Sequence, residues 1–184
     1  MKKKSLIATV ATVACIAAIG VGSTFAYFTD TKDVTNTFTM GNVNITLEEP
    51  NYTDRQTVLP GQVIVKDPTV ALATGSNDAY VVVKVTVPQY TDGTASGDLF
   101  TYDVNTGWTE VTVENPVAGV KYYGILLEGQ NRSATLFDDV TVANVTEKYK
   151  VDGDTNVDVE AYAIQAEGFD DVTAAFAAYN AQNN

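Results

Sequence analysis

Residues 79–87 have the sequence AYVVVKVTV, and this stretch decides the fold class of the chain. It is almost continuously apolar, with Lys84 and Thr86 only near its end, and valine is a β-branched residue that favours strands. A short run that is apolar on both faces is typical of a strand in the middle of a sheet. We therefore predict a central β-strand over these residues.

Shorter strands are predicted on both sides of this run. Val43, Ile45 and Leu47 alternate with polar residues, which predicts a half-buried strand. Further candidate strands are residues 108–113, 122–128, 136–142 and 157–164. Turn signals separate the candidates at Pro60-Gly61, Asp92-Gly93, Asn105-Thr106-Gly107, Gly129-Gln130-Asn131 and Asp152-Gly153-Asp154. About seven to nine strands with these turns predict a mainly β fold, an antiparallel β-sandwich.

The C-terminal end departs from the strand pattern. Asp170-Asp171 precedes the alanine-rich sequence VTAAFAAYN of residues 172–180, and aspartate is a favoured residue at the start of a helix. We predict a short C-terminal helix with one apolar face. The residues of that face would be Val172, Ala175, Phe176 and Tyr179.

The N-terminal end has the three parts of a secretory signal peptide. Lys2, Lys3 and Lys4 form a basic start, an apolar run extends from Leu6 to Val21, and Thr24-Phe25-Ala26 is a small-x-small exit. We predict a signal-peptide helix over residues 1–26, with cleavage between Ala26 and Tyr27. The run from Leu6 to Val21 is shorter than the roughly 20 apolar residues that a membrane-spanning helix needs. We therefore favour a cleaved signal peptide, and a retained membrane anchor is the alternative.

The charge of the chain restricts its partners. Its net charge is −12, and removal of Lys2, Lys3 and Lys4 with the signal peptide would take it to −15. Such a surface repels nucleic acid and anionic membranes, so we expect no nucleic-acid partner and membrane contact only through the uncleaved signal. The sole cysteine, Cys15, lies in the signal, so no disulfide is expected. We predict an extended segment over residues 27–37 and a single β-sandwich domain over residues 38–184.

Several short motifs occur in order along most of the chain. They are TFAYFTD at 24–30, FTMGNV at 38–43, LPGQ at 59–62 with Asp67-Pro68 after it, Tyr122-Tyr123, LFDDV at 136–140 and AYAIQAEGF at 161–169. Together they resemble the TasA and camelysin family of exported Firmicutes proteins, whose signal peptides are cut by a SipW-type signal peptidase. The resemblance implies a jelly-roll domain, processing by that peptidase, and self-association outside the cell as a biofilm-matrix fibre or surface layer.

The resemblance also implies a role for the N-terminus that cleavage exposes. In such fibres this segment pairs with the sheet of the next subunit, and here it is residues 27–37, YFTDTKDVTNT, with Tyr27, Phe28 and Val34 as its apolar assembly residues. An exposed sheet edge offers unpaired N–H and C=O groups that an added strand satisfies. The alternatives are a segment that folds back onto its own domain and a frayed terminus.

The residue types argue against an enzyme. The chain has no histidine, which removes Ser–His–Asp and Cys–His arrangements and HExxH-type zinc sites. We therefore predict an exported structural protein without catalytic residues, cofactor or recognisable metal site. A camelysin-like surface metalloprotease is one alternative by resemblance. Another is a monomeric surface-binding module for carbohydrate or protein, although Trp108 and the ten tyrosines are more typical of core packing than of a carbohydrate-binding face.

One acidic cluster is a weak calcium candidate. Its oxygen-bearing residues alternate along the chain and are Asp152, Asp154, Asn156 and Asp158. An EF-hand loop needs glycine at its sixth position and glutamate at its twelfth, where this chain has Val157 and Ala163. We therefore interpret the cluster as a hairpin turn built on Asp-Gly, with weak Ca²⁺ binding as the alternative.

Overall fold

The computed structural model describes residues 29–33, 36–38, 43–53, 58–93, 95–145, 150–151 and 155–183. This part of the chain contains strands β1 to β15 and the helix α2, so the mainly β class and the C-terminal helix are confirmed. All recorded strand pairings are antiparallel, as predicted. The predicted signal-peptide helix lies outside the described residues.

The largest sheet has six strands. Its order is β10 (Thr109–Glu110), β11 (Val120–Leu127), β6 (Ala79–Thr86), β15 (Asp158–Gln165), β1 (Thr29–Asp33) and β2 (Asn36–Phe38). The predicted central strand is β6, which pairs along its whole length with β11 on one side and β15 on the other. Residues 79–83 of this strand are all apolar because both edges are paired and both faces are buried there.

Three smaller sheets have three strands each. The first is β12 (Ser133–Thr135), β5 (Thr69–Leu72) and β3 (Ile45–Glu48); the second is β4 (Val63–Val65), β13 (Asp139–Val142) and β9 (Phe100–Thr101); the third is β14 (Lys150–Val151), β7 (Gln89–Asp92) and β8 (Ala95–Asp98). All of these strands have only two to four residues. The structure therefore divides the predicted sandwich into more and shorter strands than the alternation of residues predicts.

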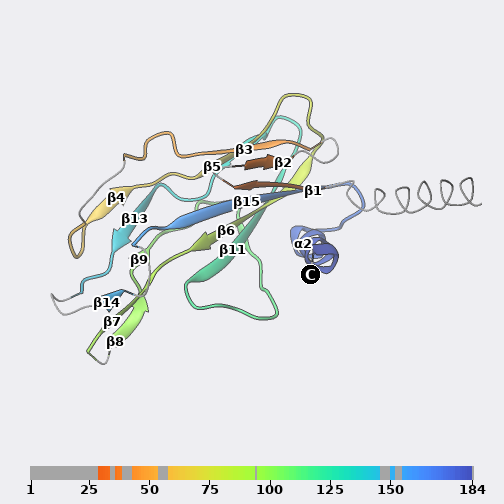
Figure 1. The fold of residues 1–184 in the computed structure, drawn as a ribbon. Coiled ribbons are helices and arrows are strands. Elements are labelled where there is room, and N and C mark those ends of the chain that lie inside the picture. Colours follow the sequence, from red (N-terminus) through yellow and green to blue (C-terminus); the bar gives the residue numbers. More distant parts are fainter. Residues whose placement is uncertain are drawn as a thin grey trace, which may run out of the picture.

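The alternation along β6 sorts its side chains into two hydrophobic clusters. Val81, Val83 and Val85 join the large core, which also holds residues of β3, β5, β11, β13 and β15. Tyr80 and Val82 point to the other face of the sheet and contact the C-terminal helix. The six-stranded sheet is thus packed between two of the smaller sheets, β12-β5-β3 and β4-β13-β9, on one side and the helix on the other (Figure 1).

Two predicted strands are shorter than expected. The candidate strand 108–113 keeps only β10 in the sheet, and although the Val111 N–H still donates to the Tyr122 carbonyl, the chain then leaves the sheet. The candidate strand 136–142 begins only at Asp139, and Leu136 and Phe137, which precede the strand, are fully buried in the core.

The helix α2 (Val172–Asn183) begins as the sequence predicts. The Asp171 carboxylate accepts a hydrogen bond of 2.8 Å from the Ala174 N–H and so caps the first turn. Val172, Ala175 and Phe176 are buried against the sheet. The helix lies so close to β11 that Gly124 faces Val172 with no room for a side chain. Among the described residues, no helix has the length and apolar character needed to cross a bilayer.

Candidate assembly site

The N-terminal strand β1 lies beside β15 in the six-stranded sheet (Figure 1). The paired residues are Thr29 with Ile164, Asp30 with Ala163, Thr31 with Tyr162 and Lys32 with Ala161. On its other side β1 forms a hairpin with β2. The described part of the segment 27–37 therefore folds back onto its own domain, which is one of the alternatives that the sequence leaves open.

The strand β15 needs a partner along the edge that β1 covers. Ala161 and Ala163 are fully buried in the large core, and Ile164 is buried on the helix side. Around these buried residues the backbone of β15 has little access to water, and an unpaired buried N–H or C=O group is costly. The backbone pairing with β1 satisfies these groups along the edge of β15.

The sequence of β1 suits an exchangeable strand. Its five residues, TDTKD, include no apolar side chain, and aspartate is depleted in strands. Backbone hydrogen bonds to β15 are therefore the main interaction that this strand can offer. Those bonds do not depend on the identity of the side chains, because every residue except proline carries the same backbone donor and acceptor.

A polar network on the helix side of β15 fixes its register with β6. Lys84 Nζ lies 3.0 Å from Glu160 Oε1, and the Tyr162 hydroxyl donates a 2.6 Å hydrogen bond to Glu160 Oε2. Burial alone would raise the pKa of Glu160, but the hydrogen bonds from Tyr162 and Lys84 outweigh it and lower that pKa. Burial and the bond to Glu160 raise the pKa of Tyr162. Glu160 is thus a charged partner of Lys84 and not a proton donor at neutral pH.

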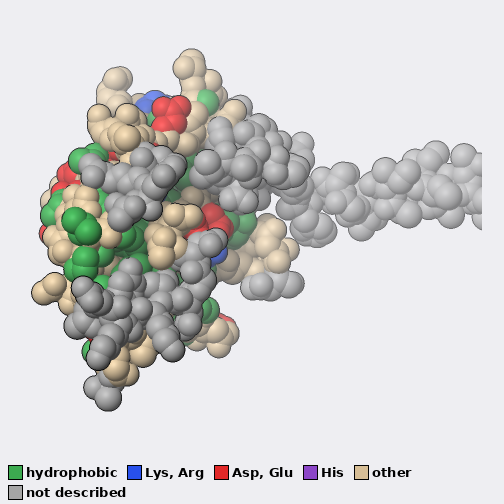
Figure 2. Space-filling model, turned by 60° about the vertical axis from the view of Figure 1, so that its left-hand side comes forward, with side chains coloured by type: hydrophobic (Ala, Val, Ile, Leu, Met, Phe, Trp, Pro, Cys, Tyr) green, Lys and Arg blue, Asp and Glu red, His purple; other side chains and the backbone are tan. Residues whose placement is uncertain are grey.

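Sequence reasoning missed an exposed apolar surface on β4, a strand at the edge of its sheet. In the described part of the chain β4 pairs only with β13, and two of its side chains, Val63 and Val65, are 56% and 50% exposed. Leu59, just before this strand, is 64% exposed. Hydrophobic side chains reach the surface on this side of the molecule, which Figure 2 brings forward. The VIV sequence could not reveal this exposure, because all three residues are apolar and nothing in it distinguishes the outward Val63 and Val65 from the buried Ile64.

The predicted site residues fall largely outside the described part of the chain. This holds for the cleavage residues Ala26 and Tyr27 and for the assembly residues Phe28 and Val34, which remain predictions. In the calcium candidate, Asp152 and Asp154 also lie outside it. Asn156 and Asp158 are exposed at the start of β15. Calcium binding therefore also remains a prediction.

A model of the camelysin metallo-endopeptidase family matches residues 1–105. The chain belongs to the camelysin family. The match extends from the N-terminus through β9, and it confirms the family that the sequence motifs indicate. Family membership indicates a protein of the cell surface or extracellular matrix. Searches of curated proteins and of solved structures returned no match.

The family is described as a metallo-endopeptidase, and such an enzyme requires a catalytic metal site. Such a site needs about three protein ligands from histidine, cysteine or carboxylate side chains. The chain has no histidine, and the residues that the structure describes contain no group of three Cys, Asp or Glu side chains that could hold a metal ion. The described part of this chain therefore does not fit a catalytic metal.

Proposed function

We propose that this protein is a structural component of the cell surface or extracellular matrix that polymerises when β1 is exchanged between copies. In the polymer, β1 of one subunit pairs with β15 of the next. One observation carries the proposal: β1 follows directly after the predicted cleavage point and covers the edge of β15, in which Ala161, Ala163 and Ile164 are buried.

The physical cost of this exchange is small. The backbone bonds of β1 with β15 are the same within one chain and between two chains, so exchange loses little interaction energy. A contact between β1 of one copy and β15 of another joins two different surfaces. Such head-to-tail contacts produce open filaments unless the rotation between subunits closes a ring.

Processing would control when exchange begins. Before cleavage, the segment ahead of β1 holds this strand close to the membrane. A SipW-type signal peptidase that cuts between Ala26 and Tyr27 would release the strand outside the cell. Self-association and this peptidase are therefore the partners that the proposal requires.

Mixing two single-cysteine variants tests the exchange. The chain that begins at Tyr27 has no cysteine of its own, and Asp30 lies opposite Ala163 in the register of β1 and β15. We expect a mixture of Asp30→Cys chains and Ala163→Cys chains to form a disulfide-linked heterodimer under mild oxidation, because paired strand residues bring cysteines within bonding range. Non-reducing electrophoresis with mass spectrometry measures it.

The matched control replaces Ala163→Cys with Asn144→Cys. Asn144 is exposed and has no pairing with β1, so this mixture reports random collisions only. The double variant Asp30→Cys/Ala163→Cys reports pairing within one chain. If the double variant closes an internal disulfide while the mixed chains give no more heterodimer than the Asn144 control, β1 stays on its own sheet and the proposal is wrong.

The family name favours a metallo-endopeptidase as the second candidate function. We expect the chain that begins at Tyr27 to give no casein hydrolysis that a chelator abolishes, because its described residues hold no metal-binding group and it has no histidine. Release of soluble peptides from labelled casein, with and without EDTA, measures this. Hydrolysis that EDTA removes and Zn²⁺ restores would replace the structural proposal with an enzymatic one.

A further inference from the structure

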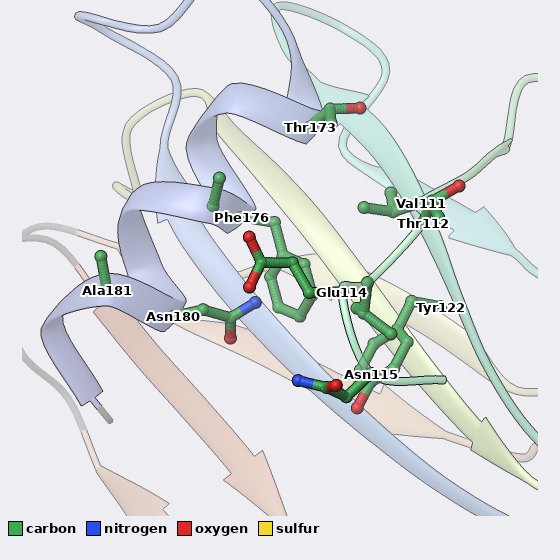
Figure 3. Close-up of a pocket in the computed structure, with 11 residues that line it drawn as sticks. Val111, Thr112, Glu114, Asn115, Tyr122, Thr173, Phe176, Asn180 and Ala181 are labelled. Carbon is green, nitrogen blue, oxygen red and sulfur yellow. The ribbon is translucent and has the colours of Figure 1, made fainter. Parts of the chain in front are cut away.

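A groove lies between α2 and residues 111–115, which follow β10 and leave the sheet (Figure 3). Its volume is about 540 Å³, within the range of roughly 300–1,000 Å³ that is typical of ligand sites. The helix supplies one wall and the departing chain supplies the other. The groove therefore exists because the chain ends its pairing with β11 after Val111 while the helix continues along the sheet.

Two aromatic rings from different elements form the apolar part of the groove. Phe176 of α2 is only 3% exposed, and its ring centroid lies 5.3 Å from that of Tyr122 on β11. Tyr122 is half-buried, so part of its ring remains open to the groove. The packing of Phe176 holds the Tyr122 ring in place, which gives a ligand a fixed apolar surface.

Polar side chains surround these rings without partners of their own. Figure 3 shows Glu114, Asn115 and Asn180 gathered around Phe176 and Tyr122. Within the described part of the chain, none of these three side chains makes a hydrogen bond or an ion pair. The two amides can donate and accept, and the carboxylate accepts. Among the described residues that line the groove, none is lysine or arginine.

We infer that this groove binds a short segment of a neutral oligosaccharide. A sugar ring presents apolar C–H groups on its faces and hydroxyl groups that both donate and accept at its rim. The Tyr122 ring can stack on the C–H groups of the sugar face. Glu114 and the two amides can form hydrogen bonds with the hydroxyl groups at its rim. A nucleotide or an acidic sugar is disfavoured, because Glu114 and the net charge of −12 repel anions.

The groove is independent of strand exchange. Its lining residues belong to α2, β11 and residues 111–115, and β1 contributes none of them. A single copy is therefore sufficient for binding, and binding does not depend on polymerisation. Together the two activities would attach a protein filament to a polysaccharide.

Calorimetric titration of the full chain with three trisaccharides tests the inference. The chain is held in a zwitterionic detergent, because glycosidic detergents present sugar rings of their own. The probes are chitotriose, cellotriose and trigalacturonate. We expect at least one neutral trisaccharide to bind in a one-to-one complex and trigalacturonate to bind at least about tenfold more weakly. The two neutral probes distinguish an N-acetylated sugar chain from a plain one.

Variants of the groove assign the binding to it. Asn180→Ala should weaken the neutral trisaccharide about fivefold, the expected effect of one lost hydrogen bond. Glu114→Gln should improve trigalacturonate binding, because it removes the repelling charge. Gln182→Ala is the matched control, since Gln182 is an exposed residue of α2 that does not line the groove. It should leave all three affinities unchanged.

NMR spectra of the unmodified chain provide a second test. The side-chain amide resonances of Asn115 and Asn180 should shift during titration, and that of Gln182 should not. Absence of binding by both neutral trisaccharides overturns the inference. So does binding that Asn180→Ala leaves unchanged, or a preference for trigalacturonate.

Discussion

A chain that begins at Phe38 should remain monomeric under conditions in which a chain that begins at Tyr27 forms filaments. The shorter chain lacks β1 and most of β2, so it keeps the β15 edge as an acceptor and has no strand to donate. Its edge between residues 161 and 164 then has no partner in any copy. Electron microscopy and sedimentation of the two chains at equal concentration measure the difference. We expect filaments from the longer chain and only monomers from the shorter one.

A synthetic peptide with the sequence of residues 27–37 provides the control. It should bind the shorter chain and raise its unfolding temperature, because it restores pairing to β15 without linking two subunits. A peptide with the same composition in scrambled order should have a smaller effect. Filaments from both chains, or monomers from both chains under all conditions tried, would contradict exchange through β1.

Substitution of Gly124→Ala should destabilise the fold by about 1–3 kcal/mol, the usual cost of overpacking a core. A Cβ atom at this position would overlap Val172 Cγ2 and lie 2.9 Å from Val172 Cγ1. Both atoms belong to the first residue of α2, so the helix must move away from β11. Urea unfolding measures the loss of free energy, and the helix signal in circular dichroism reports whether α2 stays docked.

A second substitution identifies the cause. Val172→Ala removes both overlapping methyl groups, so the double variant should lose less free energy than the two single variants together. Gly97→Ala is the matched control in another strand, because its nearest neighbour, Tyr90 Cε1, would lie at an ordinary contact distance of 3.6 Å. Simple additivity of Gly124→Ala and Val172→Ala would show that the helix does not depend on this close approach.

The elements that the sequence predicts best are those whose own residues determine them. β6 is predicted by its continuous apolar run, because a strand covered on both faces needs apolar residues throughout. α2 is predicted because its cap, Asp171, and its apolar face lie within a few residues of each other. In both cases the local pattern and the tertiary environment agree.

The candidate sites were harder to predict because their partners lie far apart in the chain. The polar sequence of β1 has no alternation, and its pairing with Ala161 and Ala163 depends on backbone groups that every residue carries. The groove requires Glu114 from a loop and Asn180 from a helix, and only the docking of α2 brings them together. No local sequence pattern in the loop or in the helix indicates that Glu114 and Asn180 lie close together.

The orientation of β1 in the sheet also has a mechanical consequence. Hydrogen bonds between antiparallel strands run perpendicular to the strands, so a pull along β1 loads all of its bonds to β15 at the same time. In a filament joined through β1, tension that runs parallel to this strand would act on each junction in shear and would not open it one bond at a time. A five-residue polar strand could then resist the stretching of a growing colony without a covalent link between its subunits.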